Sequence, residues 1–166
     1  MNIEKYINAI LYFLENIQNL GRTKLYKLLY FLDFDHYEKY GESVTGESYQ
    51  NKDLGPVPVN AEDLIDRMKE DGLIDIVSEP VIDFIRHKFK AKVHHDPKVF
   101  SSTEIEMLCE VAEKWAHHTA NEIVSASHGE APWIATARGE IIPYPYAYYR
   151  NKFAEGEELA QEATIG

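Results

Sequence analysis

Residues 24–36 read KLYKLLYFLDFDH, a stretch that is apolar around most of a helix. At about 100° per residue, leucines form one face with His36 in its middle, and aromatic residues form the neighbouring face. The leucines are Leu25, Leu28, Leu29 and Leu32, and the aromatic residues are Tyr26, Tyr30, Phe34 and Tyr37. Because such a helix is usually enclosed, we expect a central helix with Thr23 as its N-cap and Gly41 at its end.

Shorter elements are expected on both sides of this helix. Apolar spacing predicts a helix over 3–17, period-two alternation predicts a hairpin, and two S/T-x-x-E capping boxes predict helix starts. Besides the helix over 3–17, the expected elements are a short strand at Tyr49, an extended segment Gly55–Pro58, a helix from Asn60 to Gly72, strands at 73–77 and 84–93 joined by a turn containing Pro80, helices after Ser101 and Thr119, and a last helix over 146–153.

These elements predict a single α+β domain. It is mostly helical, built around the central apolar helix, with a small antiparallel β-hairpin or sheet. We expect the domain to span residues 1–154. Residues 155–166 hold four glutamates and no basic residue, so we expect them to form an acidic, mobile tail.

Composition narrows the class of protein. The 166 residues include 17 basic and 28 acidic side chains, a net charge of −11 at pH 7, so direct nucleic-acid binding is not expected. The one cysteine, Cys109, cannot form an internal disulfide and falls on the expected inward face of its helix. No apolar run is long enough to span a membrane, and residues 1–5 do not resemble a signal peptide, so we expect a cytoplasmic protein.

Positive charge is concentrated in one segment. Residues 80–98 hold five basic and two acidic side chains, a local +3 that leaves −14 for the rest of the chain. Four of the basic residues alternate along the second expected strand and share one face: Arg86, Lys88, Lys90 and Lys92. This face is either a docking strand, for an acidic partner surface or for a nucleic acid at low affinity, or an edge whose lysines prevent pairing with other chains, and both interpretations stay open.

Asp33 and His36 are the first residues that could carry chemistry. They lie three apart on one helix, close enough for a carboxylate to orient an imidazole in a base or metal site. The alternative is a buried histidine whose proton Asp33 accepts, and the position of His36 among leucines favours it. A zinc site needs three or four ligands, and no glycine-rich phosphate loop is present. We therefore expect no catalytic residue, no metal and no cofactor.

Aromatic residues gather near the C-terminus. Four tyrosines follow Trp133, at positions 144, 146, 148 and 149. Tyrosine offers apolar area with a polar tip and is enriched in protein interfaces, but half-buried tyrosine is also common in ordinary packing. Both interpretations stay open for this cluster.

An ordered set of motifs follows the helix at 24–36. It consists of Gly41, Val44-Thr45-Gly46, Tyr49, Gly55-Pro56-Val57-Pro58, Glu122-Ile123-Val124-Ser125, Ser127-His128, Glu130 and Pro132-Trp133. Over about residues 5–150 this set resembles the Panacea domain, the SocA-like antitoxin family. The matched positions, which we call the motif residues and expect to be structural or partner-binding, are Lys27, Tyr30, Asp33, His36, Tyr49, Gly55, Pro56, Val57, His128 and Trp133.

The resemblance implies a bacterial or phage-borne antitoxin of a toxin–antitoxin system. Such a protein binds a cognate protein toxin, encoded beside it, and neutralises it by protein–protein contact. The family has no established catalytic residues, so the resemblance implies no enzyme. Two alternatives stay open: an adaptor that delivers the bound toxin to an ATP-dependent protease, and a hydrolase or metal-dependent enzyme built on Asp33, His36 and His128.

Overall fold

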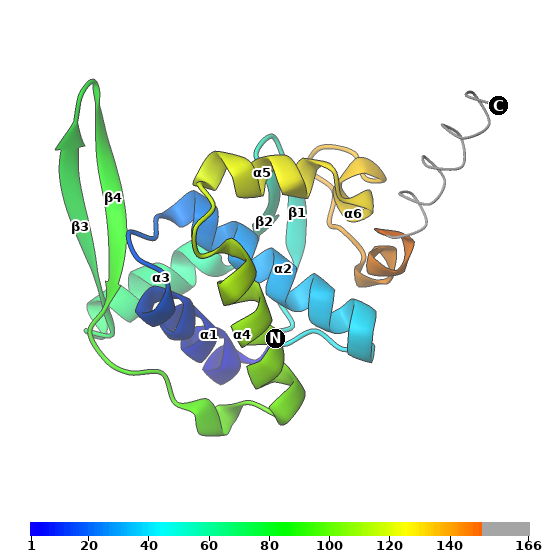
Figure 1. Ribbon diagram of the computed structural model, residues 1–166, viewed down its shortest axis with the longest axis horizontal. Helices are drawn as coiled ribbons and strands as arrows, with labels where there is room; N and C mark the ends of the chain where they lie inside the picture. Colours follow the sequence, from blue (N-terminus) through cyan, green and yellow to red (C-terminus); the bar gives the residue numbers. More distant parts are fainter. Residues whose placement is uncertain (151–166) are drawn as a thin grey trace.

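The computed structural model describes residues 1–150, in which helices and two small antiparallel sheets are arranged around one long helix (Figure 1). The helices are α1 Ile3–Asn16, α2 Arg22–Tyr40, α3 Ala61–Glu70, α4 Ser102–Trp115, α5 Ala120–His128 and α6 Ala131–Ile134, with short 3-10 helices η1 Pro97–Val99 and η2 Tyr144–Tyr149. The strands are β1 Tyr49–Lys52, β2 Gly55–Pro58, β3 Ile74–Val81 and β4 Phe84–Ala91. The predicted fold class, a mostly helical α+β domain, is confirmed.

Helix α2 is the centre of this domain. Every residue from Leu25 to Phe34 is buried, so the helix is enclosed on all sides over this length. It contacts α1, α4, α5, β2, β4 and η2 (Figure 1). The helix ends at Gly41, whose φ of 76° places its N–H on the carbonyl oxygen of Tyr37. The predicted central helix and its C-terminal stop are therefore confirmed.

Two details of the helices differ from the sequence prediction. Helix α2 starts at Arg22, with Gly21 and not Thr23 as its N-cap, so no side chain caps its first turn. Cys109 is exposed, because the inward face of α4 passes through Leu108 and Val111 and leaves Cys109 and Glu110 on the outer side. The buried residues of α4 are Glu104, Met107, Leu108, Val111, Ala112 and Trp115. The capping boxes predicted at Ser101 and Thr119 are both present.

Strands β1 and β2 form the smaller sheet and pack against α2. Their register sets Tyr49 opposite Pro58 and Val57 opposite Gln50. The expected extended conformation of Gly55–Pro58 is confirmed, and its prolines are tolerated because a two-stranded sheet leaves an outer edge on each strand. Gln50 also forms an isolated bridge with Ile141, which brings the C-terminal part of the chain to this sheet.

Strands β3 and β4 form a hairpin that projects from the helical body (Figure 1). The expected turn at Pro80 is wrong. Pro80 lies within β3, and the two residues between Val81 and Phe84 make the turn, with Asp83 at a φ of 71°. An edge strand has backbone positions that need no ladder hydrogen bond, and proline fits there.

The described chain ends shortly after η2. A 3-10 helix replaces the first part of the helix expected over 146–153. The rest of that helix and the expected tail at 155–166 lie outside the described residues, so the domain bounds stay a prediction. Within residues 1–150, none of the helices combines the length and apolar character needed to cross a membrane.

Candidate functional site

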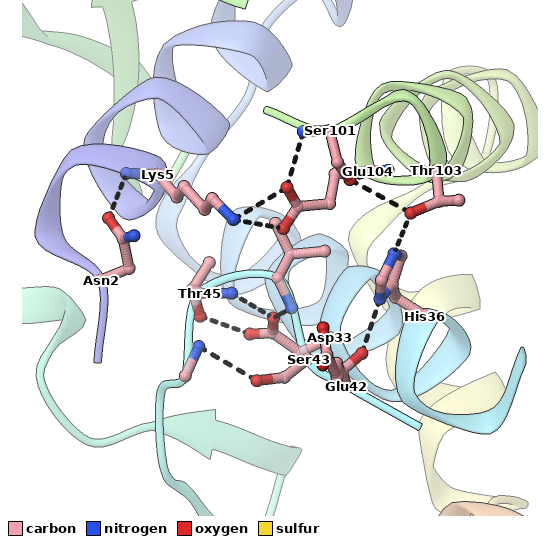
Figure 2. A network of polar contacts seen from close by, with 12 residues as sticks. Asn2, Lys5, Asp33, His36, Glu42, Ser43, Thr45, Ser101, Thr103 and Glu104 are labelled. Carbon is pink, nitrogen blue, oxygen red and sulfur yellow. Dashed lines mark hydrogen bonds and ion pairs between the residues drawn. The ribbon is translucent and has the colours of Figure 1, made fainter. Parts of the chain in front are cut away.

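Asp33 lies at the centre of a buried polar network on α2 (Figure 2). One carboxylate oxygen accepts the backbone N–H groups of Val44 (2.9 Å) and Thr45 (2.8 Å). The other accepts the hydroxyl groups of Thr45 (2.6 Å) and Tyr49 (2.5 Å). Burial raises the pKa of Asp33, and these four hydrogen bonds act in the opposite direction. Four donors around one carboxyl group make this an anchor for the 44–49 segment.

A second buried carboxylate, Glu47, continues the network. Its oxygens accept the hydroxyl of Tyr6 (2.6 Å), the backbone N–H of Asn60 (2.9 Å) and the side-chain amide of Asn60 (2.8 Å). Asn60 is the N-cap residue of α3, but its side chain bonds to Glu47 and makes no capping hydrogen bond. The backbone N–H of Glu47 donates to the hydroxyl of Thr45 (3.1 Å), so one threonine links the Asp33 carboxylate to the Glu47 backbone.

His36 does not pair with Asp33, and that expectation is wrong (Figure 2). Its Nδ1 lies 2.5 Å from the carbonyl oxygen of Glu42, and its Nε2 lies 3.0 Å from the hydroxyl oxygen of Thr103. Because a carbonyl only accepts, Nδ1 donates to Glu42. A three-residue step turns the two side chains about 60° apart, so Asp33 faces the 44–49 segment while His36 faces α4.

Lys27 is a buried cation whose amine donates to the carbonyl oxygen of Pro56 (2.8 Å). No ion pair joins it to a carboxylate within residues 1–150. Burial lowers the pKa of Lys27 to about 8. Gly55, at a φ of 96°, passes so close that a Cβ there would overlap the Ser127 hydroxyl and lie 2.9 Å from Lys27 Cε. Glycine is needed where α2, β2 and α5 meet.

His128 and Trp133 close over the turn between β1 and β2. Their rings lie 4.3 Å apart between centroids. His128 Nε2 is 2.8 Å from the carbonyl oxygen of Asp53, and the Trp133 indole donates to the carbonyl oxygen of Lys52 (3.0 Å). The Asn51 amide donates to the carbonyl oxygen of Trp133 (2.8 Å). The last motif residues therefore contact the turn that lies between motif residues Tyr49 and Gly55.

Arg150 joins the end of the described chain to α2. Its guanidinium lies 2.6 Å from Asp35 and 2.9 Å from Glu38, and it pairs with Glu130. Tyr30 donates to the same Glu130 carboxylate at 3.5 Å. Burial raises the pKa of both Asp35 and Glu130, and the nearby Arg150 charge opposes that rise. This cluster fixes the C-terminal segment across α2.

Of the C-terminal tyrosines, one packs inside the fold and two lie at the surface. Tyr144 stacks on Phe34 (4.7 Å between centroids) and Tyr37 (5.3 Å), and its hydroxyl donates to the carbonyl oxygen of Glu47 (2.5 Å). It is a packing residue. Tyr148 and Tyr149 are about half exposed, at 48% and 49%, and lie at the surface.

The three residues of the hydrolase alternative are not assembled into one site. Asp33, His36 and His128 have no hydrogen-bond partner in common and face different elements. Among residues 1–150, no group of three or more His, Cys, Asp or Glu side chains could hold a metal ion.

The docking strand is less basic in space than along the chain. The hairpin at 74–91 carries three acidic and three basic residues. Glu79 lies opposite Arg86, Asp75 lies opposite Lys90, and the Lys88 amine is 2.8 Å from the Glu79 carboxylate. The fourth residue, Lys92, follows the end of β4. Both strands are edges, and the docking role of this face stays a prediction.

Two residues that organise the site were not singled out from the sequence. Glu47 is buried and Arg150 is half-buried beside the motif residues. Glu47 follows the Val44-Thr45-Gly46 segment directly, so adjacency to that segment is the signal that could have found it. For Arg150 no local pattern points to an ion pair with residues far away in the chain.

A family model described as "Antitoxin SocA-like, Panacea domain" matches residues 25–134, more than half of the 166-residue chain. The match runs from the start of the enclosed part of α2 to the end of α6, and it contains all ten motif residues. No curated protein and no solved structure matches the chain.

Gly55→Ala tests the close approach of β2 to α2 and α5. An alanine at positive φ costs about 1–2 kcal/mol by itself, and overlap with Ser127 and Lys27 adds about 1–3 kcal/mol. Gly139→Ala is the matched control, because Gly139 also has a positive φ, of 86°, but open space at its Cβ. Urea unfolding should show a larger loss of unfolding free energy for Gly55→Ala than for Gly139→Ala. Adding Ser127→Ala to Gly55→Ala should recover part of that loss. Equal losses at the two glycines would contradict the contact.

Lys27→Met tests the buried amine through pH. The pKa of Lys27 is about 8 in the folded protein and about 10.4 in an unfolded chain, so the folded state binds fewer protons between these values. The free energy of unfolding of the wild type should therefore rise relative to Lys27→Met from about pH 7.5 to about pH 10.5, by on the order of 3 kcal/mol. Lys69→Met, at an exposed position, should show no such rise. A difference in unfolding free energy between wild type and Lys27→Met that stays constant across this pH range would refute the lowered pKa of Lys27.

Proposed function

The chain belongs to the antitoxin SocA-like, Panacea domain family, and from that premise we propose that it is an antitoxin that binds a cognate protein toxin and neutralises it by direct contact. In this proposal the toxin is encoded beside it in a bacterial or phage genome, and the pair acts in the cytoplasm. The match over residues 25–134 is the observation that carries the proposal.

The motif side chains form hydrogen bonds inside the fold, and this supports a binding role. Lys27, Asp33 and His36 are buried, and each is hydrogen-bonded to another element. A reactant would have to displace these bonds to reach them. A stoichiometric inhibitor needs a stable surface with a few anchoring side chains, and no reacting group.

The proposal is tested by expressing the adjacent reading frame alone and together with this chain. The neighbour alone should arrest growth, and co-expression should restore growth while the amount of toxin stays constant and the two proteins co-purify. Leu29→Asp, which places a charge in the core, is the control and should not restore growth. A neighbour that is harmless alone, or that stays toxic beside the wild-type chain, contradicts the proposal for that pair.

A further inference from the structure

A groove lies where the β3–β4 hairpin, the start of α2 and the α4–α5 connection meet. Its volume is about 600 Å³, within the range of ligand sites. Six of its lining residues are basic or titratable: Arg22, Lys24, Arg86, His87, His117 and His118. None of the described residues that line it is acidic, in a chain with 28 acidic residues. The lining is therefore positively charged, while two carboxylates outside it pair with its residues: Glu62 with Arg22 (3.9 Å) and Glu122 with His118 (2.8 Å).

Two of these cations are held in place by the fold. The Lys24 amine donates to the carbonyl oxygens of Ala116 (3.3 Å) and His118 (2.6 Å) at the end of α4. The Arg22 guanidinium lies 5.5 Å from the centre of the Phe89 ring. Because these side chains are fixed before any ligand arrives, an anion would not bear the entropy cost of ordering them.

One wall of the groove is the outer edge of β4. Phe89 donates its backbone N–H away from β3, to the carbonyl oxygen of Leu20 (2.9 Å). Backbone groups alternate in an antiparallel pair, so Ile85 and His87 also direct their N–H and C=O groups to this outer edge. Leu20 and Gly21 already cover this edge at Phe89 and His87, because a Cβ on Gly21 would lie 3.2 Å from the His87 carbonyl oxygen. Nearer the tip, none of the described residues outside the hairpin forms a backbone hydrogen bond with Ile85. The edge around Ile85 can therefore pair with an added strand.

The tip of the hairpin beside the groove is apolar and exposed. Ile82, Phe84 and Ile85 are 88%, 56% and 64% exposed, and Phe84 also lines the groove. Exposed apolar residues that cluster on a projecting element are typical of a protein-binding surface. They offer nothing to a phosphate backbone.

From the groove, the free edge and the apolar tip together, we propose that this surface binds an extended, acidic segment of the toxin. The segment pairs with the outer edge of β4, its carboxylates meet Arg22, Lys24 and Arg86, and its apolar side chains cover the hairpin tip. This inference rests on the proposed function. It selects a polypeptide over a nucleic acid, because an exposed apolar tip and a strand edge have no complement on a phosphate backbone.

A pair of charge reversals on one strand tests the proposal. Arg86→Glu removes a groove cation, whereas Lys90→Glu is the matched control: both side chains are exposed on the same face of β4 and lie opposite an acidic residue of β3, but Lys90 does not line the groove. The double variant Arg86→Glu/His117→Glu changes two exposed groove residues and should weaken binding further. Circular dichroism and thermal unfolding check that each variant is folded.

Binding is measured with the toxin from the adjacent reading frame, captured by the purified wild-type chain or variants. We expect affinity to fall about tenfold or more for Arg86→Glu and its double variant, and to change less than about twofold for Lys90→Glu. If the wild type neutralises and binds the toxin but the folded groove variants bind equally well, the groove is not the contact, while the proposed function stands. If the wild type fails to neutralise, the proposed function itself fails.

Overlapping 12-residue peptides that cover the toxin identify the occupant. Peptides bound by the wild type should be acidic, and Arg86→Glu should lose them. Bound peptides without carboxylates, or no bound peptide, would overturn the proposal. A fluorescent 20-nucleotide single-stranded RNA tests the other class of ligand. If the wild type binds this RNA, and Arg86→Glu loses RNA binding but still binds the toxin, the groove is assigned to nucleic acid instead.

Discussion

The carboxylate of Asp33 is the interaction on which the rest of the structure depends. A buried anion is stable only when its oxygens are supplied with donors, and the chain supplies them from Val44, Thr45 and Tyr49. This fixes the segment after α2 and the start of β1. Through Thr45 the same network reaches Glu47, which holds α1 and the start of α3. One side chain on the enclosed helix thereby positions elements on both sides of it.

Lys27, six residues earlier on α2, has the matching role toward the C-terminal half. Its amine holds β2 through Pro56, and the glycine at position 55 lets α5 approach the same point. The α5–α6 region then closes over the β1–β2 turn through His128 and Trp133. The motif residues therefore hold the body together, while the β3–β4 hairpin and the groove beside it contain none of them. This division fits the proposed role, in which the chain acts by binding.

Local patterns predicted much of the fold, and long-range partners account for what they missed. The apolar circumference of residues 25–34 and the capping boxes at Ser101 and Thr119 predicted the helices correctly. Pairing was less predictable. Asp33 and His36 are close in sequence, but each bonds to a distant segment, because helix geometry turns them toward different neighbours. Along the sequence, the basic residues of β4 have no acidic neighbours, because Asp75 and Glu79 lie opposite them only in the folded hairpin.

Backbone hydrogen exchange at Val44 and Thr45 tests the central claim most directly. Both amides donate to the Asp33 carboxylate, so Asp33→Ala should speed their exchange by about tenfold or more relative to the wild type. Asp66→Ala, at an exposed position on α3, should leave both rates unchanged. Equal protection of the Val44 and Thr45 amides in wild type and Asp33→Ala would contradict the account.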